Sequence, residues 1–188
     1  MIEYYTLMHR GGRDDYLDNV YINHGEKLTA FLYYGSSDRT TEVRSNEAKL
    51  AGAVVSGGRG RPFDEIASDV AMYMGNESEY LLIRISNEEV MIDSRGGVYA
   101  MIAKKGDVRR LPNGLMKLDN GDRIVCGTTR FYKKLTKPAI YTDAMISFSS
   151  EEWMDYMVCR ISEQTMLSEG NLTAITFIVR NDEIRIKE

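Results

Sequence analysis

The sequence is poor in the residues from which disulfides, soft-metal sites and histidine-activated nucleophiles are built. It contains two histidines and two cysteines, and neither histidine, His9 or His24, has a neighbour that would suggest a nucleophilic pair. Cys126 falls in an expected strand and Cys159 in an expected helix, without the spacing of a metal site. We therefore expect two buried, unreactive free thiols rather than a disulfide.

The sequence also lacks long apolar runs and an excess of basic residues. No stretch approaches the roughly 18 consecutive apolar residues of a membrane span, and residues 1–5 have neither the basic nor the apolar region of a signal peptide. The formal net charge is −4, so no overall positive field attracts nucleic acid or anionic lipid. These absences predict a cytoplasmic protein that binds neither nucleic acid nor membrane.

What is present is typical of one globular domain over residues 1–188. The chain is 43% hydrophobic and 28% charged, and its length is sufficient to bury a proper core. Strands are expected over 4–10, 19–23, 28–34, 80–85, 89–93, 98–103, 124–128, 172–180 and 183–187. Helices are expected over 41–55, 63–74 and 151–167, the last of them after a capping box formed by Ser149 and Glu152.

The order of these elements predicts antiparallel sheets covered by helices, which is the α+β class rather than alternating βαβ winding. Turn residues at 104–107 and at Pro112-Asn113-Gly114 predict two further hairpins. The basic stretch from Tyr132 to Tyr141 is expected to be irregular, and Gly57-Gly-Arg-Gly-Arg61 is expected to be a linker between helices.

Five short motifs, in this order along the chain, resemble those of metal-dependent phosphatases of the PP2C (PPM) type. They are Gly12-Arg-Asp-Asp-Tyr-Leu-Asp18, Ala30-Phe-Leu-Tyr-Tyr-Gly-Ser-Ser37, Ile92-Asp-Ser-Arg95, the Gly121-Asp122 strand that ends at Thr128-Thr129-Arg130, and Gly170-Asn-Leu-Thr-Ala-Ile-Thr-Phe177. The resemblance implies an α-β-β-α sandwich of two mainly antiparallel sheets flanked by helices. The chain is compact, because only residues 96–120 stand where typical members insert a flap and further strands.

The resemblance also implies two Mg²⁺ or Mn²⁺ ions held mainly by aspartates, a bridging water that attacks the phosphoester, and an arginine that grips the phosphate. Carried onto this sequence, it makes Arg13 the phosphate-binding residue and leaves Asp18 and Asp93 as residual metal ligands. Asp38 is a further candidate ligand, with helix capping as the alternative role. The positions that have lost their aspartates are Tyr34, Thr129 and Gly170.

The charge balance argues against a tight two-metal centre. Two divalent ions bring four positive charges, whereas Asp18 and Asp93 supply at most two negative ones, and hydroxyls replace carboxylates poorly. The leading hypothesis is therefore a pseudophosphatase that acts as a binding or regulatory module without a cofactor. The alternatives are an atypical serine/threonine phosphatase of the compact bacterial type that holds Mn²⁺ or Mg²⁺ weakly, and a purely structural subunit.

A basic cluster follows the lost Asp-Gly turn directly. It consists of Arg130, Lys133, Lys134 and Lys137. Arginine and lysine bind phosphate without a metal, so this cluster, with Arg13, predicts an anion site and a protein partner, with a phosphoprotein as the candidate. The alternative is a basic surface loop with no ligand.

Overall fold

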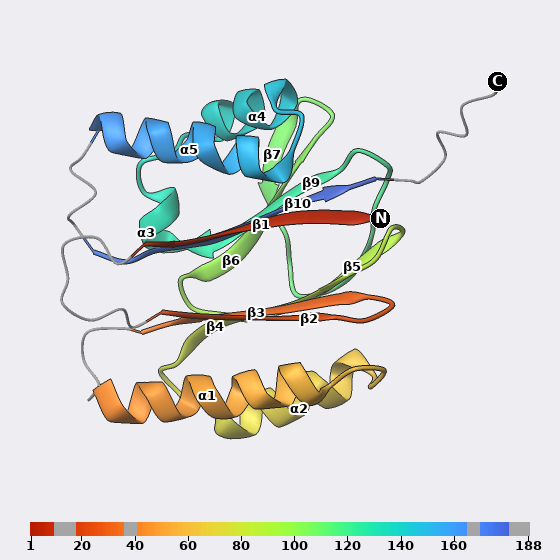
Figure 1. The fold of residues 1–188 in the computed structure, drawn as a ribbon, viewed down its shortest axis with the longest axis vertical. Helices are drawn as coiled ribbons and strands as arrows, with labels where there is room; N and C mark the ends of the chain where they lie inside the picture. The colour runs from red at the N-terminus through yellow and green to blue at the C-terminus, as the bar shows by residue number, and fades with distance from the viewer. Residues whose placement is uncertain (10–17, 36–40, 165–169, 181–188) are drawn as a thin grey trace.

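The computed structural model describes residues 1–9, 18–35, 41–164 and 170–180. Within these residues two antiparallel sheets of five strands lie face to face, and helices cover the outer face of each sheet (Figure 1). This is the α-β-β-α sandwich that the sequence predicts. No helix in the described ranges is long and apolar enough to cross a membrane.

The first sheet has the order β1-β10-β9-β6-β7. Its strands are β1 (Ile2–His9), β10 (Leu172–Val179), β9 (Arg123–Thr128), β6 (Val98–Lys104) and β7 (Asp107–Arg110). Three helices accompany this sheet, namely α3 (Thr129–Tyr132), α4 (Lys137–Ile146) and α5 (Ser150–Gln164). Figure 1 shows α4 and α5 above its outer face and α3 at one end.

The second sheet has the order β2-β3-β4-β5-β8. Its strands are β2 (Asn19–His24), β3 (Leu28–Tyr34), β4 (Glu79–Ile85), β5 (Glu89–Arg95) and β8 (Gly114–Lys117). The helices α1 (Thr41–Gly57) and α2 (Phe63–Tyr73) cover its outer face (Figure 1).

Three apolar layers hold the sandwich together. In β3, Leu28, Ala30 and Leu32 face the layer between the sheets, whereas Phe31 and Tyr33 face α1 and α2. Successive side chains of a strand point to opposite faces, so a strand buried on both faces reads as a continuous apolar run. The third layer lies between the first sheet and its helices. There Trp153, Met154 and Met157 of α5 are buried, as their spacing predicts.

The basic stretch predicted to be irregular is in fact largely helical. It contains the last residue of α3 and the first half of α4. Thr136 caps α4 by accepting a hydrogen bond from the amide of Ala139 at 3.3 Å, and Pro138 is tolerated because it stands in the first turn. Ile140 and Ala144 then face the core. The sequence prediction failed because the basic residues concealed this cap and the short apolar face.

The hairpin predicted at Pro112-Asn113-Gly114 is also wrong. β7 pairs with β6 in the first sheet and β8 pairs with β5 in the second, so this turn carries the chain across the sandwich. Asn113 fixes the crossing, because its side-chain oxygen accepts from the amide and the hydroxyl of Ser94 at 3.0 and 2.8 Å. A local turn signal does not say in which sheet the next strand will pair.

The remaining differences are small. Both cysteines are free, but Cys159 is exposed rather than buried. The hydroxyl of Ser149 accepts from the amide of Glu152 at 3.0 Å, as a capping box requires, whereas the Glu152 carboxylate reaches back to the amide of Phe148 instead of Ser149. The end of the helix predicted to reach 167, and the strand predicted over 183–187, lie outside the described residues.

Candidate functional site

One carboxylate joins the two sheets at the end of the sandwich that carries α3. Asp18 is 1% exposed. One of its oxygens accepts from the amide of Gly35, directly after β3, at 3.3 Å, and the other accepts from the hydroxyl of Thr173 in β10. Gly35 immediately follows a strand of the second sheet, and Thr173 belongs to a strand of the first. Asp18 therefore fastens the sheets together at the position that the resemblance assigns to a metal.

The surroundings of Asp18 act on its charge in opposite directions. Burial is the largest influence and raises the pKa of the Asp18 carboxyl above its ordinary value. Hydrogen bonds from Thr173, Gly35 and Asn171 and the positive charge of Arg130 oppose this shift in pKa without cancelling it.

Thr129, where the resemblance leads us to expect an aspartate, is tied to the turn between β5 and β6. Its amide and its hydroxyl both donate to the carbonyl oxygen of Gly97, at 2.6 and 2.8 Å. The amide of Gly97 donates in turn to the carboxylate of Glu79. A Cβ on Gly97 would lie 2.5 Å from Thr129 Oγ1 and 2.6 Å from Glu79 Oε2. Only glycine fits between these two side chains without displacing one of them.

Tyr34 lies next to Glu79, which contacts Gly97 and through it Thr129. It is the direct cross-strand partner of Glu79 in the β3–β4 ladder, and its half-buried side chain packs against the core between the sheets. A continuous row of contacts therefore runs from Tyr34 through Glu79 and Gly97 to Thr129. Glu79 was not predicted from the sequence, because only the register of β3 against β4 places it opposite Tyr34.

Asp93 faces the opposite side of the second sheet. Its neighbour Ile92 belongs to the core between the sheets, whereas Asp93 accepts a hydrogen bond at 2.9 Å from the hydroxyl of Tyr80, which packs against α1 and α2. Burial, followed by this hydrogen bond, raises the pKa of Tyr80 to about 12. The Asp93 side chain therefore points away from Tyr34 and Thr129.

The other candidate residues are distributed as follows. Gly170 is buried, has a φ of +123°, and immediately precedes Asn171, whose side chain contacts Asp18. Arg13 and Asp38 lie outside the described residues. The structure thus brings Asp18, Tyr34, Thr129 and Gly170 to one end of the sandwich and turns Asp93 away.

Basic residues lie on α3 and in the turn that follows it. Phe131 and Tyr132 are buried in the core beneath the helix. Arg130 is half-buried on α3, and Lys133 and Lys134 stand in the turn directly after its last residue, Tyr132. Within the described part of the chain, no carboxylate forms an ion pair with Arg130, Lys133 or Lys134, or with Lys137 at the start of α4.

The donor set at this end does not fit a pair of divalent cations. Mg²⁺ and Mn²⁺ are bound mainly through carboxylates, and the described ranges contain no group of three histidine, cysteine, aspartate or glutamate side chains placed to hold a metal. Each oxygen of Asp18 already accepts a hydrogen bond from the protein. The hydroxyl of Thr129 donates to a carbonyl, and Arg130 adds positive charge.

Comparison with known proteins shows the fold of the chain. No family model matches the sequence, and no curated protein is similar to it in sequence. Among solved structures, Stp1 from Staphylococcus aureus, a serine/threonine phosphatase, is 11% identical with a TM-score of 0.77 and 96% of each chain covered. RsbX in complex with magnesium is 14% identical with a TM-score of 0.74 and 94% of each chain covered.

A third similar structure is the catalytic domain of the serine/threonine protein phosphatase PstP with two manganese ions. It is 11% identical, with a TM-score of 0.70, and the match covers 96% of this chain and 99% of that one. The chain therefore has the fold of the bacterial PP2C-type serine/threonine phosphatases, as the five motifs imply.

Proposed function

We propose that this protein is a pseudophosphatase, a PP2C-like domain that acts as a binding or regulatory module for a phosphorylated or otherwise anionic protein partner. One observation carries the proposal. Asp18, the motif aspartate that lies at the α3 end, is occupied in joining the two sheets, while Tyr34 and Thr129 stand where the resemblance leads us to expect further aspartates.

The charge at this end favours an anionic ligand. Arg130 is half-buried beside Asp18, without an ion pair in the described ranges, and Lys133 and Lys134 follow in the turn after α3. A guanidinium forms bidentate, charge-assisted hydrogen bonds with a phosphate group. Asp18 supplies at most one negative charge, which offsets only part of the positive charge of Arg130, Lys133 and Lys134.

A binding experiment tests this assignment. A fluorescent phosphoserine peptide is titrated with the purified protein, with the unphosphorylated peptide as the reference. We expect saturable binding of the phosphopeptide alone and at least about tenfold weaker binding by Arg130→Gln, because a charge-assisted contact is lost. Arg109→Gln, an exposed arginine on β7, is the matched control and should bind as the wild type does. Equal binding of both peptides, or an unchanged Arg130→Gln variant, would contradict the proposal.

The alternative function is an atypical Mn²⁺- or Mg²⁺-dependent serine/threonine phosphatase. Two observations support it. RsbX was solved with magnesium and PstP with manganese. In this chain Glu79, which belongs to none of the five motifs, supplies a carboxylate beside Thr129. Incubation with Mn²⁺ and an aryl phosphate separates the two functions. Metal-dependent turnover that is abolished by Glu79→Gln, in a variant that remains folded, would establish the alternative and reject the pseudophosphatase.

A further inference from the structure

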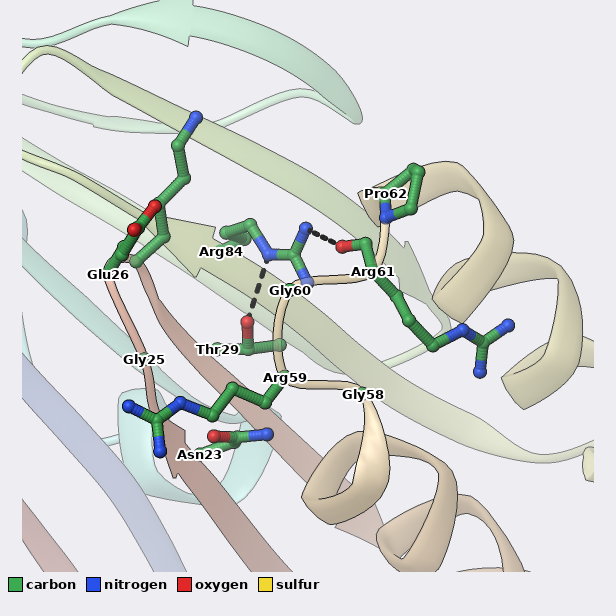
Figure 2. A pocket seen from close by; sticks show the side chains of 11 residues that line it. Asn23, Gly25, Glu26, Thr29, Gly58, Arg59, Gly60, Arg61, Pro62 and Arg84 are labelled. Carbon is green, nitrogen blue, oxygen red and sulfur yellow. Dashed lines mark hydrogen bonds between the residues drawn. The ribbon is translucent and has the colours of Figure 1, made fainter.

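A second basic site lies at the end of the sandwich opposite α3. A cavity of about 440 Å³ opens between the β2–β3 turn and the linker that joins α1 to α2. Figure 2 shows the turn at Gly25 and Glu26 on one side, the linker from Gly58 to Pro62 on the other, and Arg84 between them. Neither the five motifs nor the proposed function involves this cavity.

Arg84 is held rigidly between the turn and the linker. Its Nε donates to Thr29 Oγ1 at 3.0 Å, and one of its terminal nitrogens donates to the carbonyl oxygen of Arg61 at 2.7 Å. Its guanidinium also lies 5.8 Å from the centre of the Phe63 ring. Side chains fixed in this way lose little entropy when a ligand binds.

The positive charge of Arg84 is not neutralised. The side chain is half-buried, and burial lowers its pKa. Among the described residues no carboxylate pairs with it. A partly desolvated charge without a counterion is unfavourable. A bound anion would therefore reduce the free-energy penalty of burying the Arg84 guanidinium without a partner.

Arg59 supplies a second cation from the linker. Its side chain extends across the cavity towards the β2–β3 turn (Figure 2), and a Cβ on Gly25 would lie 3.5 Å from Arg59 Cγ. Arg59 is exposed and forms no ion pair within the described ranges. The Arg61 side chain, by contrast, turns away from Arg84 to pair with Asp69 at 2.7 Å.

The other polar groups around the cavity suit hydroxyls rather than a second phosphate. Asn23 uses its amide nitrogen to donate to the carbonyls of Val55 and Ser56, which leaves its oxygen as an acceptor. Glu26 adds a carboxylate, and Lys27 is already paired with Glu89 at 2.6 Å. No aromatic side chain is among the described residues that line the cavity, so nothing there would stack on a nucleobase.

We propose that this cavity binds a small phosphate monoester with a hydroxyl-bearing body, such as a sugar phosphate, whose phosphoryl oxygens contact Arg59 and Arg84. Two guanidinium groups provide the planar donor geometry that phosphate oxygens accept. The volume falls within the range of about 300–1,000 Å³ typical of small-molecule sites, which leaves space for more than a free phosphate ion.

Calorimetric titrations at constant ionic strength test the proposal with three probes, namely ribose 5-phosphate, ribose and inorganic phosphate. We expect saturable binding of ribose 5-phosphate, weaker binding of inorganic phosphate, and none of ribose. Arg59→Gln should weaken the binding of ribose 5-phosphate by about tenfold or more. This variant is chosen because Arg59 is exposed and forms no ion pair within the described ranges.

Two controls separate this site from the α3 end. Arg130→Gln and Arg109→Gln should bind ribose 5-phosphate as the wild type does. The proposal is overturned if ribose 5-phosphate does not bind at millimolar concentration, if Arg59→Gln binds it unchanged, or if Arg130→Gln abolishes the binding. Equal affinity for inorganic phosphate and ribose 5-phosphate would reject an ester as the ligand.

Discussion

Asp18 accepts a hydrogen bond from the hydroxyl of Thr173, although the two residues are 155 positions apart in the chain. The bond links the residue that precedes β2 in the second sheet to a strand in the interior of the first sheet. The carboxylate at this position is therefore part of the architecture of the sandwich, and its loss should be visible in stability.

Replacing Asp18 with alanine should lower the free energy of unfolding by about 3 kcal/mol, because the Gly35 amide and the Thr173 hydroxyl would both lose their buried acceptor. Asp18→Asn keeps an oxygen at this position and should cost less, about 1 kcal/mol. Urea denaturation followed by circular dichroism measures both, with the exposed Asp107→Asn as a control. Equal stability of the alanine variant and the wild type would show that the bridge does not hold the sheets.

The raised pKa of Asp18 should make stability depend on pH. The native state binds a proton more readily than the unfolded chain, whose carboxyl has the ordinary value near 3.8. The stability due to Asp18 is therefore fully present below that value and is lost as pH rises through the native pKa. Between pH 4 and pH 7, the wild type should lose unfolding free energy relative to Asp18→Asn. A difference that is constant over this window would contradict the shift.

Gly97 should not tolerate a side chain. Gly97→Ala places a methyl group against Thr129 Oγ1 and Glu79 Oε2, and the displacement should cost about 1–3 kcal/mol. Gly57→Ala is the matched control, because a Cβ there meets no atom within 4 Å and should leave stability unchanged or slightly increased. Thermal unfolding of the two variants provides the comparison. Equal melting temperatures would mean that the Glu79 and Thr129 side chains adjust freely.

The two thiols should differ in reactivity. Cys126 is fully buried, and burial raises the pKa of its thiol, so neither access nor thiolate formation favours reaction. Cys159 is exposed on α5. A disulfide reagent that releases a coloured thiolate should therefore label one cysteine in the native protein and two in denaturant. Labelling of both cysteines in the native protein would contradict the burial of β9.

The sequence was sufficient to predict the architecture because the apolar strands and the five motifs carry that information locally. β3 is a clear case, since its run of apolar residues from Leu28 onward predicts a strand buried on both faces. Non-local features could not be predicted in the same way. The crossing at Asn113 depends on which sheet accepts β8, and α4 depends on a cap and a short apolar face that basic residues surround.

In the candidate site, too, the sequence indicated local features but not the contacts between distant segments. The motifs pointed to Asp18, Tyr34 and Thr129 as candidate positions, and these three residues lie at the same end of the sandwich. The motifs did not give the direction of the Asp93 side chain, because a shift of one residue in strand register reverses the face of every side chain. Glu79 and Arg84 were missed for a related reason. Their neighbours come from strands or linkers that are distant in sequence.

The position of β10 has a consequence for how the protein is made. β1 pairs with β10 along its whole length, from Ile2 with Val179 to His9 with Leu172, and β10 lies between β1 and β9. On the ribosome, β1 and β9 emerge while the strand that separates them has not yet been translated. The first sheet can therefore be completed only after residues 172–179 have left the ribosome. Until then the edges of β1 and β9 that pair with β10 are unpaired and can associate with other chains, which favours chaperone binding to the nascent chain.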